Sequence, residues 1–268
     1  MAEESAFLSR ARAWDAFYAE PRVAEFRRRL YLEAFGGEYP ADEATDGYIT
    51  RSELREMVGR LHAGPGQKIA DLGCGRGGPG QWIARATGVE LVGIDFSAEA
   101  LEQARARARR LGINNSYQSA SFDATGLDPA SVDGAISIDV IWAIPDKRAG
   151  FAETARILKP GARFVFTDWE RDLSPPGYPA PVNDHRPLLQ ATGFEVELRQ
   201  LRPYADSLRR SFYEKMLARQ GELMREVDEK TAESILREAR AWLGLLDGVD
   251  YLHHSRRVLV ATRKFAER

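Results

Sequence analysis

Short apolar runs alternate with longer amphipathic stretches through the middle of the chain. Five of the runs have the length and residue content of strands: "KIADLG", "LVGID", "NSYQSASFD", "GAISID" and "RFVFTDW". Three stretches typical of helices lie among them: "GQWIARATG", "SAEALEQARARARRLG" and "DKRAGFAETARILKPG". Because strands that alternate with helices assemble into a parallel sheet with crossovers, the pattern predicts a doubly wound α/β fold.

The two flanks of this region have a helical rhythm. Residues 5–35 predict two helices, with Pro21 opening the second, and "TRSELREMVGRL" predicts another that Thr50 or Ser52 caps. After the fifth strand, "DHRPLLQATGFEVELRQL" adds a helix and a strand. The run "RRVLVATRK" is then expected as the last strand of a mostly parallel, seven-stranded sheet with a Rossmann-like order.

A helical insertion separates the last two predicted strands. Its apolar positions, among them Leu223, Ile235 and Trp242, indicate amphipathic helices, and it is long enough to cover a site. We therefore predict one domain, residues 1–268, in which cap elements at 1–50 and 203–250 surround a core at 56–201 and 256–266.

The composition is that of an ordinary soluble protein, with 44% hydrophobic and 29% charged residues among 268. A net charge of −2 favours neither nucleic acid nor an anionic membrane as a partner. The arginines stand among acidic residues along the predicted helices, which predicts solvated helix faces. One cysteine, Cys74, excludes an internal disulfide and a cysteine-based zinc site. With no secretory pattern and no membrane-length apolar run, we expect a cytoplasmic protein without a metal.

The stretch "DLGCGRGGPG" at 71–80 places five glycines where the first strand turns into a helix. In doubly wound sheets ligands bind beyond the carboxyl ends of the strands, and glycines there let the backbone approach a ligand closely. Amide groups at the start of the helix can bind a carboxylate or a phosphate. The residues "GCGRGG" also match the dinucleotide fingerprint, with Asp95 twenty positions after Gly75, which leaves an NAD-dependent oxidoreductase as an alternative.

Three acidic residues favour a different nucleotide. Asp71 precedes the glycines, Asp95 ends the second predicted strand, and Asp123 ends the third. The Asp95 carboxylate could accept hydrogen bonds from two ribose hydroxyls, and that of Asp123 from an adenine amino group. Such a lining suits a cationic nucleoside better than a pyrophosphate.

At these residues the chain resembles the class I S-adenosylmethionine-dependent methyltransferases. The segments "DLGCGRGGPG", "LVGIDFS", "FDAT" and "RILKPGARFVFTDW" are similar to four successive motifs of that family, over roughly residues 65–200 and the last strand. The resemblance implies S-adenosylmethionine as the cofactor and S-adenosylhomocysteine as its product. It also implies a cofactor site made of Asp71, Gly73, Cys74, Gly75, Gly77, Asp95, Phe96, Asp123, Ala124 and Ile138.

The position of the helical insertion resembles the small-molecule methyltransferases of natural-product pathways, so we expect a small-molecule acceptor. Many such enzymes carry a histidine pair after the fourth strand, whereas this chain has "DVIWAIPDK", and that base is not carried over. Methylation of oxygen, nitrogen or carbon stays open. A cyclase that uses the same cofactor structurally is a second alternative.

Two residues are candidates for a general base. Asp168 lies at the end of the fifth predicted strand, and His185 begins the helix whose start returns to the same edge of the sheet. Each could instead be a structural residue. The candidate walls of the acceptor pocket are aromatic and could equally be plain packing: Trp142, Tyr18, Trp14 and Tyr48.

Overall fold

The computed structural model describes residues 12, 14–174, 178–248 and 254–265. Its centre is a seven-stranded sheet with the order β3-β2-β1-β4-β5-β7-β6. Every pairing is parallel except the two that β7 makes with β5 and β6. The strands are β1 (Lys68–Leu72), β2 (Glu90–Asp95), β3 (Ser116–Ser119), β4 (Val132–Ile138), β5 (Leu158–Arg171), β6 (Phe194–Leu201) and β7 (His254–Arg263). The predicted fold class is confirmed.

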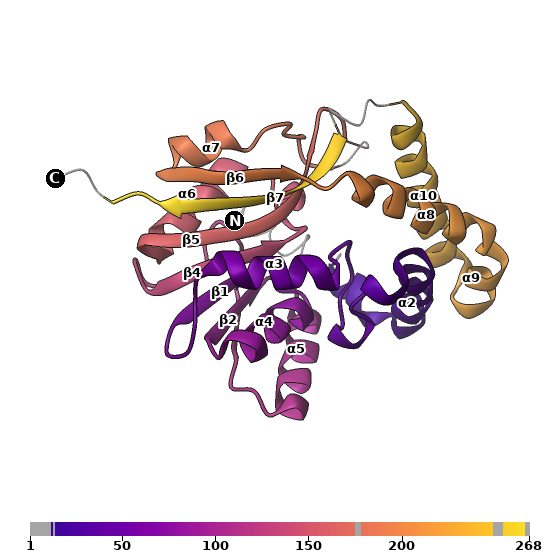
Figure 1. The fold of residues 1–268 in the computed structure, drawn as a ribbon. Helices are drawn as coiled ribbons and strands as arrows, with labels where there is room; N and C mark the ends of the chain where they lie inside the picture. The colour runs from indigo at the N-terminus through magenta and orange to yellow at the C-terminus, as the bar shows by residue number, and fades with distance from the viewer. Residues whose placement is uncertain (1–11, 13, 175–177, 249–253, 266–268) are drawn as a thin grey trace.

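Helices cover both faces of this sheet and one of its ends (Figure 1). On the near face of Figure 1 lie α3 and α4, with α5 at the lower edge; α6 lies behind the strands, and α7 lies at the upper edge beside β6. At the end where the parallel strands finish, α2 and α8 to α10 gather into a cap. The helices are α2 (Pro21–Phe35), α3 (Arg51–Leu61), α4 (Gly78–Thr87), α5 (Ala98–Leu111), α6 (Lys147–Ile157), α7 (Arg186–Ala191), α8 (Pro203–Ala218), α9 (Gln220–Glu226) and α10 (Glu229–Gly248).

Local sequence signals set where several helices begin. Pro21 occupies the start of α2, where its missing amide hydrogen costs nothing. Thr50 caps α3 in a capping box, since its side chain accepts from the amide of Glu53 while the Glu53 side chain accepts from the amide of Thr50. Ser97 caps α5 by accepting from the amide of Ala100 at 3.1 Å. Of the two predicted caps of α3, Thr50 and Ser52, the N-cap is Thr50.

Three hydrophobic clusters hold these layers together. One joins α6 and α7 to the far face of the sheet around Phe151, Phe164 and Phe166. A second packs α3 and α4 on the near face through side chains such as Leu54 and Ile83. The third cluster lies within the cap and reaches β5 only at its carboxyl end, so the cap has a core of its own.

Two expectations need correction. The third strand ends at Ser119 rather than at Asp123, because the chain bends away into a short Ser121–Ala124 bridge. Five arginines are buried rather than solvated, because they insert between the cap, the helices and the sheet: Arg107, Arg171, Arg202, Arg209 and Arg256. The parts of the predicted cap at 1–11, 13 and 249–250, and positions 175–177 and 266 of the predicted core, lie outside the described residues.

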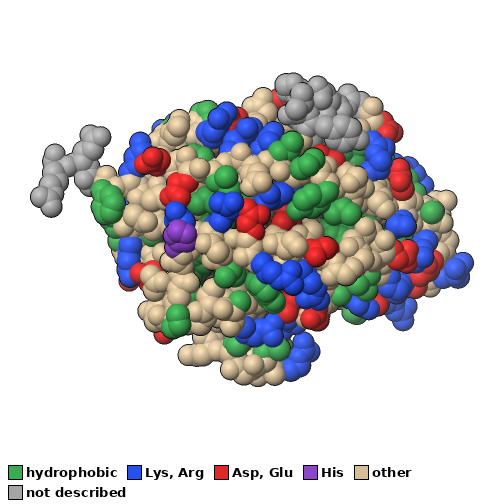
Figure 2. Space-filling model, in the orientation of Figure 1, with side chains coloured by type: hydrophobic (Ala, Val, Ile, Leu, Met, Phe, Trp, Pro, Cys, Tyr) green, Lys and Arg blue, Asp and Glu red, His purple; other side chains and the backbone are tan. Residues whose placement is uncertain are grey.

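The visible surface in Figure 2 mixes acidic and basic side chains over most of its area, with no large field of one sign. Among the described residues, no helix combines the length and the apolar character needed to cross a bilayer. The same residues contain no cluster of histidine, cysteine and carboxylate side chains suited to hold a metal ion.

Candidate active site

The glycine-rich loop joins β1 to α4 at the carboxyl edge of the sheet. The amides of Gly73 and Cys74 donate to the carbonyl of Ile94 on β2, at 2.8 and 3.0 Å, which fixes the loop to its neighbouring strand. Gly75 has φ of 50°, and a Cβ there would lie 2.9 Å from the hydroxyl of Tyr18. A residue with a side chain at this position would therefore be strained and would also push Tyr18 away.

Asp71 lies at the base of the loop and is 3% exposed. A Cβ on Gly80, in the first turn of α4, would come within 2.1 Å of its Oδ2 atom, so glycine is required for the helix to approach the carboxylate. Burial, with a further contribution from the charge of Asp95, raises the pKa of Asp71 to about 7. The group is thus poised to lose its proton when positive charge arrives.

Asp95 ends β2, and backbone amides hold its carboxylate in place. Oδ2 accepts from the amide of Gly75 at 2.8 Å, and Oδ1 accepts from the amide of Ser97 at 2.9 Å. Burial raises the pKa of Asp95, these amide bonds act against that rise, and the nearby Asp15 carboxylate adds to it. A carboxylate has about four acceptor positions, and the amides of Gly75, Phe96 and Ser97 use three, which leaves room for a ribose hydroxyl. A carboxylate fixed in this way at the end of β2 is compatible with the nucleoside that the sequence predicted.

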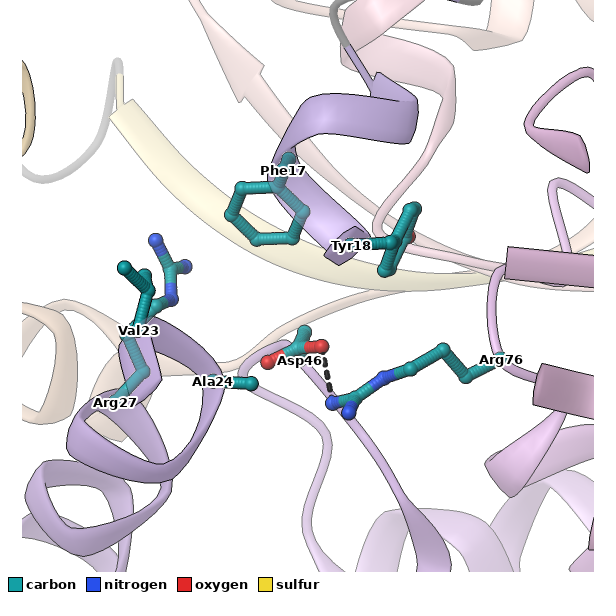
Figure 3. A pocket seen from close by; sticks show the side chains of 7 residues that line it. All are labelled: Phe17, Tyr18, Val23, Ala24, Arg27, Asp46 and Arg76. Carbon is teal, nitrogen blue, oxygen red and sulfur yellow. Dashed lines mark hydrogen bonds and ion pairs between the residues drawn. The ribbon is translucent and has the colours of Figure 1, made fainter. Parts of the chain in front are cut away.

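The segment before α2 covers this loop. Residues 14–19 are helical, and their Tyr18 lies against Gly75, where burial and the Asp95 charge raise the pKa of its hydroxyl. Arg76 of the loop pairs with Asp46. Figure 3 shows these side chains facing one another around a small pocket. Its lining consists of Phe17, Tyr18, Val23, Ala24, Arg27, Asp46 and Arg76.

The other residues predicted for the cofactor site lie along the same edge. Phe96 and Ile138 are half-buried at the ends of β2 and β4, and Cys74 is buried within the glycine loop. Asp123 and Ala124 lie in the turn after β3, where Asp123 is half-buried and Ala124 is exposed. Their contact with adenine stays a prediction.

Asp168 and His185 meet, although 17 positions separate them. His185 Nε2 lies 2.8 Å from Asp168 Oδ2, and both side chains are 0% exposed. The second carboxylate oxygen of Asp168 accepts from the amide of Trp142 at 3.0 Å. The rings of Phe151 and Phe166 pack on the imidazole. The pair is therefore buried beside the turn that follows β4, and its function as a base stays a prediction.

That turn is organised by Asp139, which has φ of 56°. Its carbonyl accepts from the indole of Trp142 at 2.6 Å, and its carboxylate accepts from the amide of Tyr48 at 3.3 Å. Buried Arg256 of β7 pairs with the same carboxylate at 2.7 Å. Asp139 thus connects two of the predicted aromatic wall residues, one from the sheet edge and one from the segment before α3.

The four predicted wall residues fall into two groups. Trp142 and Tyr48 border the cap, where Tyr48 packs on Trp169 and Trp142 lies 5.6 Å from Tyr178 between ring centroids. Trp14 stacks instead on Tyr18, over the glycine loop. The structure therefore places Trp14 and Tyr18 beside the cofactor loop, and Trp142 and Tyr48 where the cap meets β5.

Several residues at this edge escaped the sequence analysis. Asp15 accepts from the hydroxyl of Ser97 at 2.6 Å and so connects the N-terminal helix to the start of α5. Asp46, Arg76 and Asp139 were missed as well. Arg76 stands inside the glycine motif and Asp139 directly follows the fourth strand, so position alone could have flagged these two. The acids at 15 and 46 carry no comparable signal.

Comparison with known proteins agrees with this geometry. The family model described as a methyltransferase domain matches residues 69–161. The O-methyltransferase resE of Aspergillus sclerotiorum is 32% identical over 214 residues, which cover 73% of this chain and 79% of that protein. Methyltransferase GfsG of Streptomyces halstedii is 35% identical over 169 residues, which cover 58% of this chain and 59% of that protein.

Solved structures share the fold. The chain resembles a putative sarcosine dimethylglycine methyltransferase from Galdieria sulphuraria with a TM-score of 0.68, at 18% identity, over 89% of this chain and 98% of that one. It also resembles the [4+2]-cyclase SpnF with a TM-score of 0.69, at 19% identity, over 80% and 81% of the two chains. At these identities the likeness shows the fold alone, and it adds little to the cyclase alternative. The fold, the glycine loop and the resE match together establish that this chain belongs to the S-adenosylmethionine-dependent methyltransferases, with S-adenosylmethionine as its cofactor.

Proposed function

We propose that this enzyme transfers a methyl group to a small-molecule acceptor held between the carboxyl edge of the sheet and the helical cap. The observation that carries the proposal is the meeting of the cap with the carboxyl end of β5, at the same edge of the sheet as the glycine loop. Aromatic side chains from the sheet edge, the cap and the segment before α3 converge there: Trp142, Trp169, Trp242, Tyr48 and Tyr213. An apolar, covered site with a few polar groups is typical of small-molecule binding.

The residues of the chain have separable functions in this proposal. When bound, S-adenosylmethionine supplies a methyl group made electrophilic by a sulfonium. Asp95 holds the nucleoside beside the glycine loop, which fixes the direction from which the acceptor must approach. Alignment of this kind can lower a barrier by about 7–11 kcal/mol. The cap excludes water and holds the acceptor in line.

A hydroxyl acceptor also needs a group that takes its proton. The Asp168–His185 pair lies beside Trp142 at the same edge, so we propose it as that group, either directly or through a water molecule. A positioned base contributes about 10²–10⁴-fold in rate. An amine acceptor would not need the pair as a base.

The proposal is tested in two steps with purified protein. Titration calorimetry should show binding of S-adenosylmethionine and S-adenosylhomocysteine, and none of NAD. Formation of S-adenosylhomocysteine is then measured against hydroxylated aromatics, amines and enolisable carbonyl compounds, with a duplex oligonucleotide as the macromolecular control. Methylation of the oligonucleotide but of no small molecule would refute the proposal. Acceptor turnover without methyl transfer would favour the cyclase instead.

A further inference from the structure

Two buried arginines lie among the aromatic residues between sheet and cap. Arg171, the last residue of β5, is 2% exposed, and its guanidinium carbon lies 4.9 Å from the ring centroid of Trp242 and 5.6 Å from that of Trp142. Arg209 of α8 is 4% exposed and lies 3.8 Å from the centroid of Trp242. The two cations therefore share one indole.

In contrast to buried Arg107 and Arg256, Arg171 has no carboxylate partner among the described residues. Arg107 pairs with Glu43 at 2.6 Å, and Arg256 pairs with Asp139 at 2.7 Å. Within the described ranges, by contrast, no carboxylate comes within the 4.0 Å that defines an ion pair with Arg171. A charge taken out of water is costly unless it is paired, so an uncompensated arginine in this position calls for an anion.

The charge balance around Arg171 points the same way. Asp168 is close enough to act on Arg171, but its two oxygens already serve His185 and the amide of Trp142. Burial and the charge of Arg209 lower the pKa of Arg171 to about 10. Burial also lowers the pKa of Lys147, which is near enough to repel Arg171. Positive charge thus exceeds the negative charge available to Arg171.

The location ties this surplus to the proposed acceptor site. Arg171 lies three residues beyond Asp168, and the indoles against it come from the turn after β4 and from α10 of the cap. A guanidinium offers a planar fork of donors that matches a carboxylate or a phosphate, and the indoles offer flat apolar walls. We propose that Arg171 binds an anionic group of the acceptor, a carboxylate or a phosphate attached to an apolar body. This inference rests on the proposed function and names the acceptor class for the same site.

The experiment compares charged and neutral probes of one shape on the protein saturated with S-adenosylhomocysteine. Benzoate and phenyl phosphate are the anions, with benzamide and benzyl alcohol as neutral counterparts. Binding is followed by calorimetry and by tryptophan fluorescence, since two indoles lie against Arg171. We expect each anion to bind at least tenfold more tightly than its neutral counterpart, and the better anion identifies carboxylate or phosphate. Equal binding of charged and neutral probes, or no binding of any probe, would overturn the proposal.

Variants separate recognition from packing. Arg171→Gln should remove the preference for anions while the affinity for S-adenosylhomocysteine stays unchanged, and Arg171→Lys should keep part of it. Arg210→Gln, which removes a half-buried arginine that pairs with Asp247, is the matched control and should behave as wild type. An anion preference that survives in Arg171→Gln contradicts the assignment. If Arg171→Gln does not fold, the ratio of anion to neutral-probe affinity in wild type and in Arg171→Lys still tests the proposal. Failure of S-adenosylhomocysteine to bind to wild type would instead count against the proposed function.

Discussion

Asp71 should release a proton when the cofactor binds. Its carboxyl is buried at the base of the glycine loop, and burial together with the Asp95 charge raises its pKa from 3.8 to about 7. S-adenosylmethionine brings a sulfonium and an ammonium group, and the family resemblance places its methionine part beside Asp71. Positive charge nearby favours the ionised carboxylate and lowers the pKa again. Cofactor binding and deprotonation of Asp71 are therefore linked.

The size of this linkage follows from the pKa. With a value of about 7, roughly three-quarters of the free enzyme carries the Asp71 proton at pH 6.5, and roughly one-tenth at pH 8. If binding lowers the pKa below about 5, about 0.7 proton is released per site at pH 6.5 and about 0.1 at pH 8. S-adenosylhomocysteine, which lacks the sulfonium charge, should release fewer protons than S-adenosylmethionine.

Calorimetry in buffers of different ionisation enthalpy measures the released protons directly. Asp71→Asn is the control, because it keeps the shape of the side chain and cannot titrate. Any proton exchanged by the cofactor's own amine occurs in both proteins and cancels in the difference. An equal proton release from wild type and Asp71→Asn at pH 6.5 would refute the reasoning.

The raised pKa of Asp71 also makes the stability of the ligand-free protein depend on pH. The folded state holds the Asp71 proton more tightly than the unfolded chain does, so the free energy of unfolding should fall as pH rises from about 4 to about 7. The contribution is fully present below pH 4 and is lost above 7, with an upper limit of about 4 kcal/mol. Urea unfolding of wild type and Asp71→Asn across this range measures it, and parallel pH profiles of the two proteins would contradict it.

Three further perturbations test the rest of the site. Asp95→Ala should weaken cofactor binding about tenfold or more. It should also lower the free energy of unfolding by about 1–3 kcal/mol for each of the two amide donors, of Gly75 and Ser97, that it leaves unpaired. Unchanged calorimetric affinity in a folded variant would mean that this carboxylate does not bind the ribose. Amide hydrogen exchange in α2 and α8 to α10 should slow when cofactor and acceptor bind, whereas protection confined to the glycine loop would make the cap a static scaffold. If the acceptor is a hydroxyl, Asp168→Asn and His185→Ala should lower turnover about 10²–10⁴-fold with cofactor affinity near wild type, and full activity in both variants would exclude a base function.

The sequence predicts the sheet well because its signals are local. Strands β1, β2 and β4 are short apolar runs bounded by glycine or acidic residues, and Ser97 caps the helix α5 that lies between β2 and β4 in the chain. The position of Asp95 next to the loop follows from the same pattern, because parallel strands end at one edge. These features depend on neighbours in sequence, so no knowledge of distant contacts is needed.

Contacts between distant segments were beyond the reach of sequence reasoning. The contact of Tyr18 with Gly75 is one case, because it depends on the helix at 14–19 lying over the loop, and the predicted contact of Tyr18 with an acceptor stays a prediction. The buried arginines are a second case. An arginine among acidic residues has the same local pattern whether its helix face meets water or another helix, and the contact of α8 with β5 and α10 decides which.

For the Asp168–His185 pair, the sequence predicts the proximity of the two residues but not their burial. Parallel topology brings the end of β5 and the start of α7 to one edge, which is why the two residues could be expected near each other. Their burial depends on Phe151 of α6 and on the indole turn after β4, neither of which the topology specifies. The enclosed pair stabilises the turn that carries Trp142, because Asp168 accepts a hydrogen bond from the Trp142 amide. Its oxygen and nitrogen atoms can therefore take part in proton transfer only where acceptor binding opens a path past that turn, so the motion of the cap and the chemistry of the pair belong to the same question.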